Sequence, residues 1–301
     1  MADLLVMKQE FEQATNIYQH LIYNYSPHRK SLDAAYKIAL INYKYKPELI
    51  ATQDELASLL KIYTVYDENG PIEFGRHGSL HDGGYVIPLK ALKEADVLMG
   101  YGIDNDNSFE DLFSLNYKKP SYGFDCGITT IKGKSDLFHF VDECIANDNF
   151  LYNHQNSNKK ITTFNTQIEN QKLQNKKVFI KMDIEGAEYD AFSDIIQHSA
   201  NITGIALEMH FQDLPAMKKA VSLLKDLDQD FLLVHVHGNN YCRQSFNSCN
   251  AKGAIPNVIE LSFINKSLVK NYHLSKNQKH PTALDNPNMQ YKADSVFEIL
   301  V

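Results

Sequence analysis

The sequence predicts an α/β fold in which a doubly wound, mainly parallel β-sheet follows an α-helical N-terminal extension. Apolar residues recur at helical spacing over positions 1 to 66, short apolar runs follow Gly70, and helical stretches separate several of these runs. Strands that alternate with helices form βαβ units, which place parallel strands in one sheet. We therefore expect a helical extension or cap over residues 1–75 and a sheet domain over residues 76–301.

The predicted extension consists of amphipathic helices. Apolar side chains recur at roughly helical intervals between Leu4 and Ile22 and again between Leu32 and Ile41. Pro27 and Pro47 predict breaks, and Thr52–Glu55 resembles a capping box that would open a third helix. These helices carry no evident chemistry, so we expect them to cover the domain or to form the surface of a homo-oligomer.

The predicted sheet consists of short runs of apolar residues. Several runs are apolar at consecutive positions, which is typical of strands with both faces covered. Residues 187–198 and 214–228 are the clearest intervening helices, and residues 153–175, rich in Asn and Gln, predict a long connection. The candidate strands are residues 97–99, 122–124, 178–180, 202–209, 231–236 and 258–264.

The composition argues against several kinds of partner. The formal net charge is -7, whereas nucleic acids and anionic membranes attract basic surfaces. No apolar run approaches the ~20 residues that span a bilayer, and residues 1–8 lack the basic start of a signal peptide. Cys126, Cys144, Cys242 and Cys249 form no Cys-x-x-Cys pair. We therefore expect reduced thiols and a cytoplasmic location.

Polar residues follow the predicted strands, where ligands bind in open α/β sheets. The run at 97–99 leads into Gly100 and Gly102, and Asp125 follows the next run. A carboxylate about 20 residues after a glycine turn is suited to accept hydrogen bonds from ribose hydroxyls. This pair predicts a nucleoside site without choosing between NAD and S-adenosylmethionine.

Two further strand ends carry acids and histidines. Asp183 and Glu185 directly follow the run at 178–180, where a ligand crevice would open. Glu188 and Asp190 come next, and we assign both to the helix dipole. Glu208 lies near the end of another run and is predicted to share one strand face with His210.

The last pair of histidines stands at the end of the run at 231–236. We expect His235 and His237 to point to opposite faces of the sheet, so that only one of them faces a given pocket. His237 abuts a Gly-Asn-Asn turn and is the better functional candidate, whereas His235 is assigned to packing.

The ordered set of motifs between residues 76 and 265 resembles the FkbM-type methyltransferases, in particular the branch found in bacterial capsule and polysaccharide gene clusters. The most specific element is the Asp-Ile-Glu-Gly-Ala-Glu stretch. The motifs are, in order, His81–Tyr85, Tyr101–Asp104 with Ser108–Glu110, Gly123–Asp125, Lys181–Glu188, Leu207–His210, His237–Asn240 and Val258–Leu261.

This resemblance implies a class I methyltransferase, Rossmann-like fold with S-adenosylmethionine above the first strands. Ser108 and Glu110 would lie at the methionine side of the cofactor, Asp125 would hold the ribose hydroxyls, and Asp183 would lie near the transferring methyl group. The implied cofactor-binding residues are Gly100, Tyr101, Gly102, Ser108, Glu110, Asp125 and Asp183.

The resemblance also implies O-methylation of a hydroxyl group on a sugar or a nucleotide-activated sugar. A sugar hydroxyl is a poor acid, so we nominate His210 or His237 as the general base, with Asp183 or Glu208 orienting its imidazole. In the alternative, Asp183, Glu208 and His210 bind Mg²⁺ or Mn²⁺. We prefer the base without a metal.

Two other functions remain open on the residues alone. A nucleotide-binding oxidoreductase could use the same sheet, and it would bind nicotinamide rather than S-adenosylmethionine. A non-catalytic protein could bind sugar nucleotides and use its helices for assembly. The acids and histidines at the strand ends argue against the second alternative, since burying them would give a scaffold no advantage.

Overall fold

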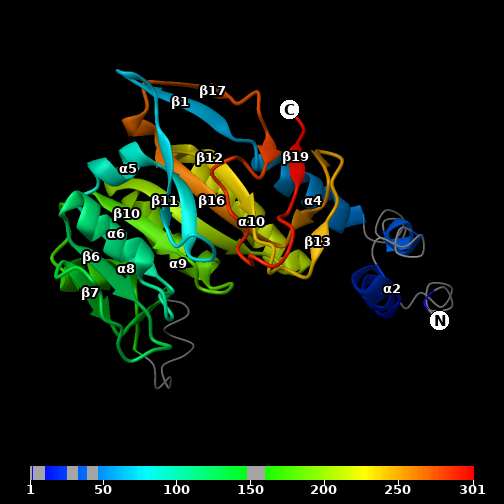
Figure 1. Cartoon of the computed structure of the whole chain (residues 1–301), viewed down its shortest axis with the longest axis horizontal. Coiled ribbons are helices and arrows are strands. Elements are labelled where there is room, and N and C mark those ends of the chain that lie inside the picture. Colours follow the sequence, from blue (N-terminus) through cyan, green and yellow to red (C-terminus); the bar gives the residue numbers. More distant parts are fainter. Residues whose placement is uncertain (1, 3–10, 26–32, 39–46, 148–159) are drawn as a thin grey trace.

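A computed structural model describes residues 2, 11–25, 33–38, 47–147 and 160–301. Its centre is a seven-stranded sheet in the order β12-β16-β11-β10-β5-β6-β7 (Figure 1). Neighbouring strands are parallel except at β16, which is antiparallel to β11 and β12. This arrangement confirms the predicted mainly parallel sheet. The strands are β5 (Val97–Tyr101), β6 (Ser121–Phe124), β7 (Phe138–Val141), β10 (Val178–Met182), β11 (Ile202–His210), β12 (Phe231–Gly238) and β16 (Val258–Asn265).

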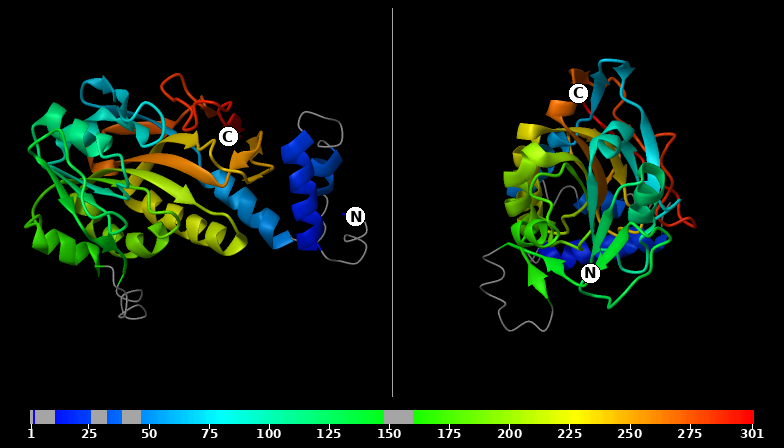
Figure 2. Two further views of the ribbon diagram at one scale, coloured as in Figure 1. Left: turned by 60° about the horizontal axis from the view of Figure 1, so that its bottom comes forward. Right: turned by 90° about the vertical axis from the view of Figure 1, so that its left-hand side faces the viewer.

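Helices cover both faces of the sheet, and Figure 2 shows the two layers from the side. Val97 and Met99 of β5 pack into one core and Leu98 into the other, which explains why the strands are apolar at consecutive positions. One layer contains α4 (Pro47–Leu59), α8 (Phe164–Asn170), α9 (Glu188–Ile195) and α10 (Leu214–Asp230). The other contains α5 (Leu89–Glu94), α6 (Ser108–Tyr117) and the hairpin of β3 (Phe74–Gly78) and β4 (Gly84–Pro88).

The N-terminal helices differ in how they relate to this core. In α2 (Phe11–Tyr25), Ala14 and Tyr18 join a small separate cluster with Ala34. In α4, Leu56 belongs to the main core, and Lys225 of α10 forms an ion pair with Glu55. Residues 47–75 therefore pack on the sheet, while the boundary at residue 75 and an oligomer through the helices stay predictions.

Two details of the predicted extension are wrong. The helical region ends before residue 66, because β1 (Tyr63–Asp67) pairs with β17 (Asn271–Leu274) and with β2 (Gly70–Pro71). The capping box is absent as well, since α4 begins at Pro47 and Thr52 lies inside it. The Thr52 hydroxyl donates to the carbonyl of Glu48 at 2.8 Å. A proline in the first turn starts this helix instead.

The predicted connection at 153–175 contains more structure than expected. Residues 153–159 lie outside the described part of the chain, but β9 (Ile161–Thr162) and α8 follow. Thr163 caps α8 by accepting a hydrogen bond from the amide of Thr166 at 3.1 Å. Burial of Phe164 and Ile168 against the main core stabilises α8. The polar composition of the segment gave no sign of this burial.

The two histidines of β12 lie on one face of the sheet. Residues two apart on a strand share a face, so the prediction of opposite faces is wrong. The register shifts between Leu233 and His235. Val236, which stands between the two histidines in the sequence, packs into the main core on the opposite face. His235 contacts Asp285 and His237 contacts Asp294, so both face the same C-terminal segment.

That segment, residues 281–296, is called the C-terminal tail below. It runs between β18 (Lys279–His280) and β19 (Phe297–Ile299), and Figure 1 shows it in red across β12 and β16. The imidazole of His81 donates to the carbonyl of Pro287 at 2.8 Å, and the amide of Asn240 donates to the carbonyl of Met289 at 3.0 Å. The small strands β13 (Ser245–Phe246), β14 (Ala251–Lys252) and β15 (Ile255–Pro256) complete this region.

Among the described helices, none is long and apolar enough to cross a membrane.

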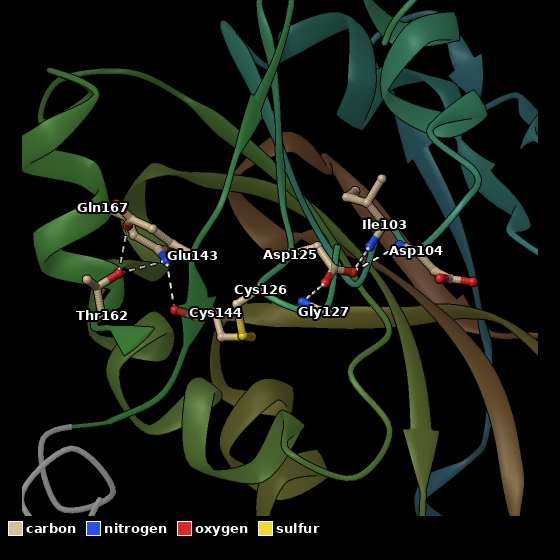
Figure 3. The surroundings of a disulfide bond; sticks show 9 residues. All are labelled: Ile103, Asp104, Asp125, Cys126, Gly127, Glu143, Cys144, Thr162 and Gln167. Atoms are coloured by element: carbon tan, nitrogen blue, oxygen red, sulfur yellow. Dashed lines mark hydrogen bonds between the residues drawn. A yellow bond between two sulfur atoms is a disulfide. The ribbon is translucent and has the colours of Figure 1, made fainter. Parts of the chain in front are cut away.

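A disulfide joins Cys126 to Cys144, which corrects the expectation of four reduced thiols (Figure 3). Cys126 follows β6, and Cys144 begins β8 (Cys144–Ile145) just beyond β7. Because β6 and β7 are neighbours in the sheet, residues 18 positions apart come into contact. Cys242 and Cys249 are free.

Replacing both disulfide cysteines with serine should lower the free energy of unfolding by about 2–3 kcal/mol, because the unfolded chain regains the entropy of a short loop. Urea titration of the variant and of the wild-type protein measures this loss. Cys242→Ser is the matched control and should leave the midpoint unchanged. A double variant as stable as the wild-type protein would contradict the expectation.

Candidate active site at the carboxyl ends of the strands

The glycine turn after β5 is packed against the chain that follows β10. Gly102 has φ +74°, and a Cβ there would lie 1.6 Å from the carbonyl oxygen of Asp183. The amide of Asp183 donates to the carbonyl of Tyr101 at 3.1 Å, and the Lys181 ammonium donates to the carbonyl of Gly102 at 2.8 Å. Only glycine permits this approach, which holds Asp183 beside the turn.

Lys181 is a buried residue of the candidate site that was not singled out from the sequence. Its side chain is buried, although lysine is rarely buried without a partner. A lone lysine inside the otherwise apolar run of β10 was the available signal. Its contact with the turn joins the two strand ends.

Asp125 lies beside the same turn, as Figure 3 shows. Its Oδ2 accepts hydrogen bonds from the amides of Ile103 at 3.0 Å and Asp104 at 2.9 Å. Its Oδ1 accepts from the amide of Gly127 at 2.6 Å. The carboxylate that was predicted to hold ribose hydroxyls therefore also shapes the loop, and Asp104 takes a left-handed φ of 42° in it.

The start of α6 adds polar atoms at this edge. Glu110 packs against Gly100, where a Cβ would lie 1.9 Å from its Oε1, and burial raises the pKa of Glu110 to about 7. The Tyr101 side chain points away into the main core, where its hydroxyl donates to Gln167 at 3.0 Å. Among the described residues, Asn107 Nδ2, Ser108 Oγ, Glu110 Oε1 and Asp183 Oδ1 are buried without hydrogen-bond partners.

Asp183 lies next to a buried imidazole–carboxylate pair. His210 Nδ1 lies 3.0 Å from Oε1 of Glu188, a residue with no exposed surface. The same oxygen accepts hydrogen bonds from the amides of Ile184 and Gly186. Glu188 was assigned to the helix dipole, but its burial beneath His210 makes it the partner that orients this imidazole.

His210 is also close to acids through its second nitrogen. Nε2 lies 3.3 Å from the exposed Glu185 carboxylate and 3.4 Å from Glu208. Burial alone would lower the pKa of His210, but the contacts with Glu188 and Glu208 outweigh burial and raise this pKa to about 11. The imidazole is therefore positively charged at neutral pH.

Glu208 lies in β11 and His237 lies in β12, the two strands that follow β10 along the chain. Glu208 accepts a hydrogen bond from the Asn239 amide at 3.0 Å, and burial with the nearby charge of Asp183 raises the pKa of Glu208 to about 8. His237 is only 1% exposed and contacts Glu260 through Nδ1 at 2.8 Å and Asp294 through Nε2 at 3.1 Å. His237 thus connects Glu260 of the sheet, through Nδ1, to Asp294 of the C-terminal tail, through Nε2.

The candidate metal ligands fall into two groups. Asp183 and His210 lie together as predicted, but the third member of that group is Glu188, whereas Glu208 groups with Asp82 and Glu260. Within each group the potential ligand atoms lie within 4.8 Å of one another.

The sheet order, the glycine turn, the acid at the next strand end and Asp183 together form the architecture of a class I methyltransferase. The family model of the methyltransferase FkbM domain matches residues 83–241, more than half of the 301 residues. The chain therefore belongs to the FkbM methyltransferase family. It is a methyltransferase that uses S-adenosylmethionine, which sets the oxidoreductase and the non-catalytic alternatives aside.

No curated protein matches the sequence. One similar solved structure is that of the plantazolicin methyltransferase BpumL in complex with SAH. It is 8% identical, and the similarity covers 86% of this chain and 99% of that chain with a TM-score of 0.25. So low a TM-score carries no argument about this chain.

The unpartnered atoms at the glycine turn fit the amino-acid end of S-adenosylmethionine. Asn107 Nδ2 and Ser108 Oγ are donors suited to a carboxylate, while Glu110 Oε1 is an acceptor suited to an ammonium group. Buried polar atoms are costly without partners, so these residues match a polar ligand. The cofactor supplies a methyl group on a positively charged sulfur.

Gly102→Ala should lower the free energy of unfolding by at least about 2 kcal/mol more than Gly186→Ala, because only the first adds a clash to the cost of positive φ. Gly186 has φ +101° with no atom within 4 Å of an added Cβ, so it is the matched control. Urea unfolding of both variants measures the difference. Equal losses would show that the turn does not press on Asp183.

His237→Gln should lower the free energy of unfolding by about 3 kcal/mol at pH 6, because it leaves buried carboxylates without their cation. Contacts with Asp294 and Glu260 raise the pKa of folded His237 to about 10, above the unfolded value near 6.5. Its contribution is thus complete below pH 6.5 and disappears as the pH rises through 10. Urea unfolding at pH 6, 8 and 10 should show the two proteins converging, and a constant difference would contradict this.

Proposed function

We propose that the protein transfers a methyl group to a hydroxyl of a sugar or nucleotide-activated sugar used to build a capsule or another polysaccharide. The observation that carries the proposal is the buried Oδ1 of Asp183, which has no hydrogen-bond partner among the described residues and lies beside the charged His210. A hydroxyl group would supply the missing donor.

The contacts favour a carboxylate rather than an imidazole as the base. A general base needs a free lone pair at the working pH, whereas the raised pKa values of His210 and His237 keep both imidazoles protonated. Burial raises the pKa of Asp183, which makes its carboxylate a stronger base than an exposed aspartate. We assign proton acceptance to Asp183, and His210 stabilises the negative charge beside it.

In the proposed methyl transfer, every bond and proton is accounted for. The acceptor oxygen forms a bond to the methyl carbon, the carbon–sulfur bond breaks, and its electron pair stays on sulfur. The hydroxyl proton moves to Oδ1 of Asp183. Glu188 keeps His210 oriented, and His237 contributes by holding the C-terminal tail.

The groups around Asp183 suit a polyhydroxylated acceptor. Carboxylate and amide oxygens accept hydrogen bonds from sugar hydroxyls, whereas a phosphate would be repelled by the clustered acids. A nucleotide diphosphate on the acceptor would therefore extend away from this cluster. The polar groups on this side are those of Asp82, Glu208, Asn239, Glu260 and Asn288.

We retain a general base that acts without a metal, with Asp183 as the base and His210 beside it. A histidine ligand must be neutral to donate its lone pair, and His210 is held as an imidazolium by Glu188 and Glu208. The charged imidazole therefore favours proton transfer over coordination at this group.

Asp183→Asn should lower methyl transfer by at least about a hundredfold, because the base is lost, while S-adenosylhomocysteine still binds. Asp190→Asn, in the first turn of α9 just after the loop that carries Asp183, is the matched control for turnover. Titration calorimetry with S-adenosylhomocysteine measures binding, and Asp125→Ala should abolish it. Turnover is measured as the release of S-adenosylhomocysteine from S-adenosylmethionine in the presence of a panel of nucleotide-activated sugars.

Three results would contradict the proposal. Wild-type protein that binds no S-adenosylhomocysteine would exclude the cofactor site, and Asp183→Asn protein with near-normal turnover would exclude Asp183 as the base. Turnover with no sugar nucleotide in the panel, but with acceptors of another class, would exclude the proposed acceptor.

A further inference from the structure

Three carboxylates from distant parts of the chain meet beside the site but outside the proposed proton transfer. Asp82 lies in the turn between β3 and β4, Glu208 lies in β11, and Glu260 lies in β16. One oxygen atom of each lies within 4.8 Å of those of the other two. Glu208 is 5% exposed and Glu260 is 3% exposed, so two of the three are shielded from water.

The register of the sheet forces two of these acids together. Glu208 and Glu260 are direct partners across the antiparallel pair β11 and β16, so their side chains leave the same face side by side. Like charges directly opposite on neighbouring strands are destabilising, and burial strengthens the repulsion. A fold that keeps this pair needs positive charge close to both oxygens.

The histidines supply only part of that charge. His237 is shared between Glu260 and Asp294, and His210 is shared between Glu208 and Glu188. Asp82 has no ion-pair partner within the described residues. The two histidines therefore leave the Asp82 carboxylate without a cation beside it.

A buried amide points to a ligand at the same place. Asn288 of the C-terminal tail is 3% exposed, and its Nδ2 donates to Oδ1 of Asp82 at 3.2 Å and to Glu260. Its Oδ1 is buried with no hydrogen-bond partner among the described residues. Rotation of this amide by half a turn exchanges its donor for the unpartnered oxygen and directs four oxygen donors at one point.

The hydroxyl of Tyr85 faces the same cluster. Burial raises the pKa of Tyr85, and the charges of Asp183, Glu208, Glu260 and Asp82 raise it further. Tyr85 is 1% exposed, so the four acids act on a tyrosine that lies almost entirely away from water.

The turn that carries Asp82 is held in place from two sides. The Arg76 guanidinium donates to the carbonyls of Ser79 at 3.1 Å and His81 at 2.6 Å. The His81 imidazole reaches across to Pro287 of the C-terminal tail. The turn that carries Asp82 is therefore fixed before any ligand arrives, which lowers the entropy cost of binding.

We infer that Asp82, Glu208, Glu260 and the carboxamide oxygen of Asn288 bind a divalent cation of the Mg²⁺ or Mn²⁺ type. All four donors are oxygen atoms, which hard cations prefer, and no thiolate or imidazole takes part. The site shares no residue with the group of Asp183, Glu188 and His210.

One consequence rests on the proposed function. Mg²⁺ and Mn²⁺ bind more oxygen atoms than these side chains provide, so a cation here has coordination positions left for an acceptor. Two neighbouring hydroxyls of a sugar could fill them and present a third hydroxyl to Asp183. Cation binding itself does not depend on this role.

Titration with Mn²⁺, followed by electron paramagnetic resonance of the free ion, tests the inference on the full chain without cofactor or acceptor. We expect one saturable Mn²⁺ ion that Mg²⁺ displaces. Asp82→Asn should weaken binding by at least about tenfold, as loss of a ligand does. Because Asp82 lies in an exposed turn, this variant keeps the buried pairs intact.

Two further variants separate this site from its neighbours. Asn288→Asp adds a fourth carboxylate and should tighten Mn²⁺ binding, whereas Asn288→Leu should weaken it. Asp183→Asn removes no ligand of this site, although its charge acts on Glu208, and should weaken Mn²⁺ binding less than Asp82→Asn does.

The inference would be overturned by the absence of saturable Mn²⁺ binding, or by wild-type affinity in Asp82→Asn. Loss of binding in Asp183→Asn with retention in Asp82→Asn would place the ion at the other group and would also overturn it. A protein that binds S-adenosylhomocysteine but no Mn²⁺ would leave the proposed function standing and remove only the cation.

Discussion

The close contact between the glycine turn after β5 and the main chain after β10 is the constraint on which the site depends. Gly102 touches the carbonyl of Asp183, and Lys181 reaches back to the carbonyl of Gly102. These contacts place the glycine turn and Asp183 together at one edge of the sheet. Asp125 then sets the shape of the same turn through its hydrogen bonds to Ile103 and Asp104.

A second set of constraints comes from buried charges. The ends of β11, β12 and β16 carry acids and imidazoles that are removed from water, and His210 and His237 are each shared by two carboxylates or more. A buried charge is tolerated when it is paired, and removing one partner is costly. These contacts hold the C-terminal tail against the sheet, and they also keep the region around Asp183 polar and ordered.

The sheet could be predicted because consecutive apolar positions and strand-end polar residues are local signals. All six predicted runs lie in the central sheet, and Gly102, Asp125 and Asp183 lie at one edge of it. The errors concern relations between distant segments. Glu188 looks like a helix-start acid until β11 brings His210 above it, and the partnership of Cys126 with Cys144 depends on β6 lying beside β7.

The same reasoning explains why the acidic cluster was missed. Glu260 is one polar residue in an apolar run, and only the antiparallel insertion of β16 beside β11 places it opposite Glu208. The error about His235 and His237 was of another kind. Residues two apart share a strand face, so the sequence contained the correct answer, and the register shift decides only which face that is.

The C-terminal tail has a consequence for how the enzyme can diversify. The FkbM domain match ends at residue 241, whereas Glu260, Asp285, Asn288 and Asp294 all lie beyond it. The proposed cofactor half of the site thus lies within the matched domain, and part of the proposed acceptor half lies after it. Substitutions, insertions or exchanges after residue 241 can reshape one half without disturbing the glycine turn.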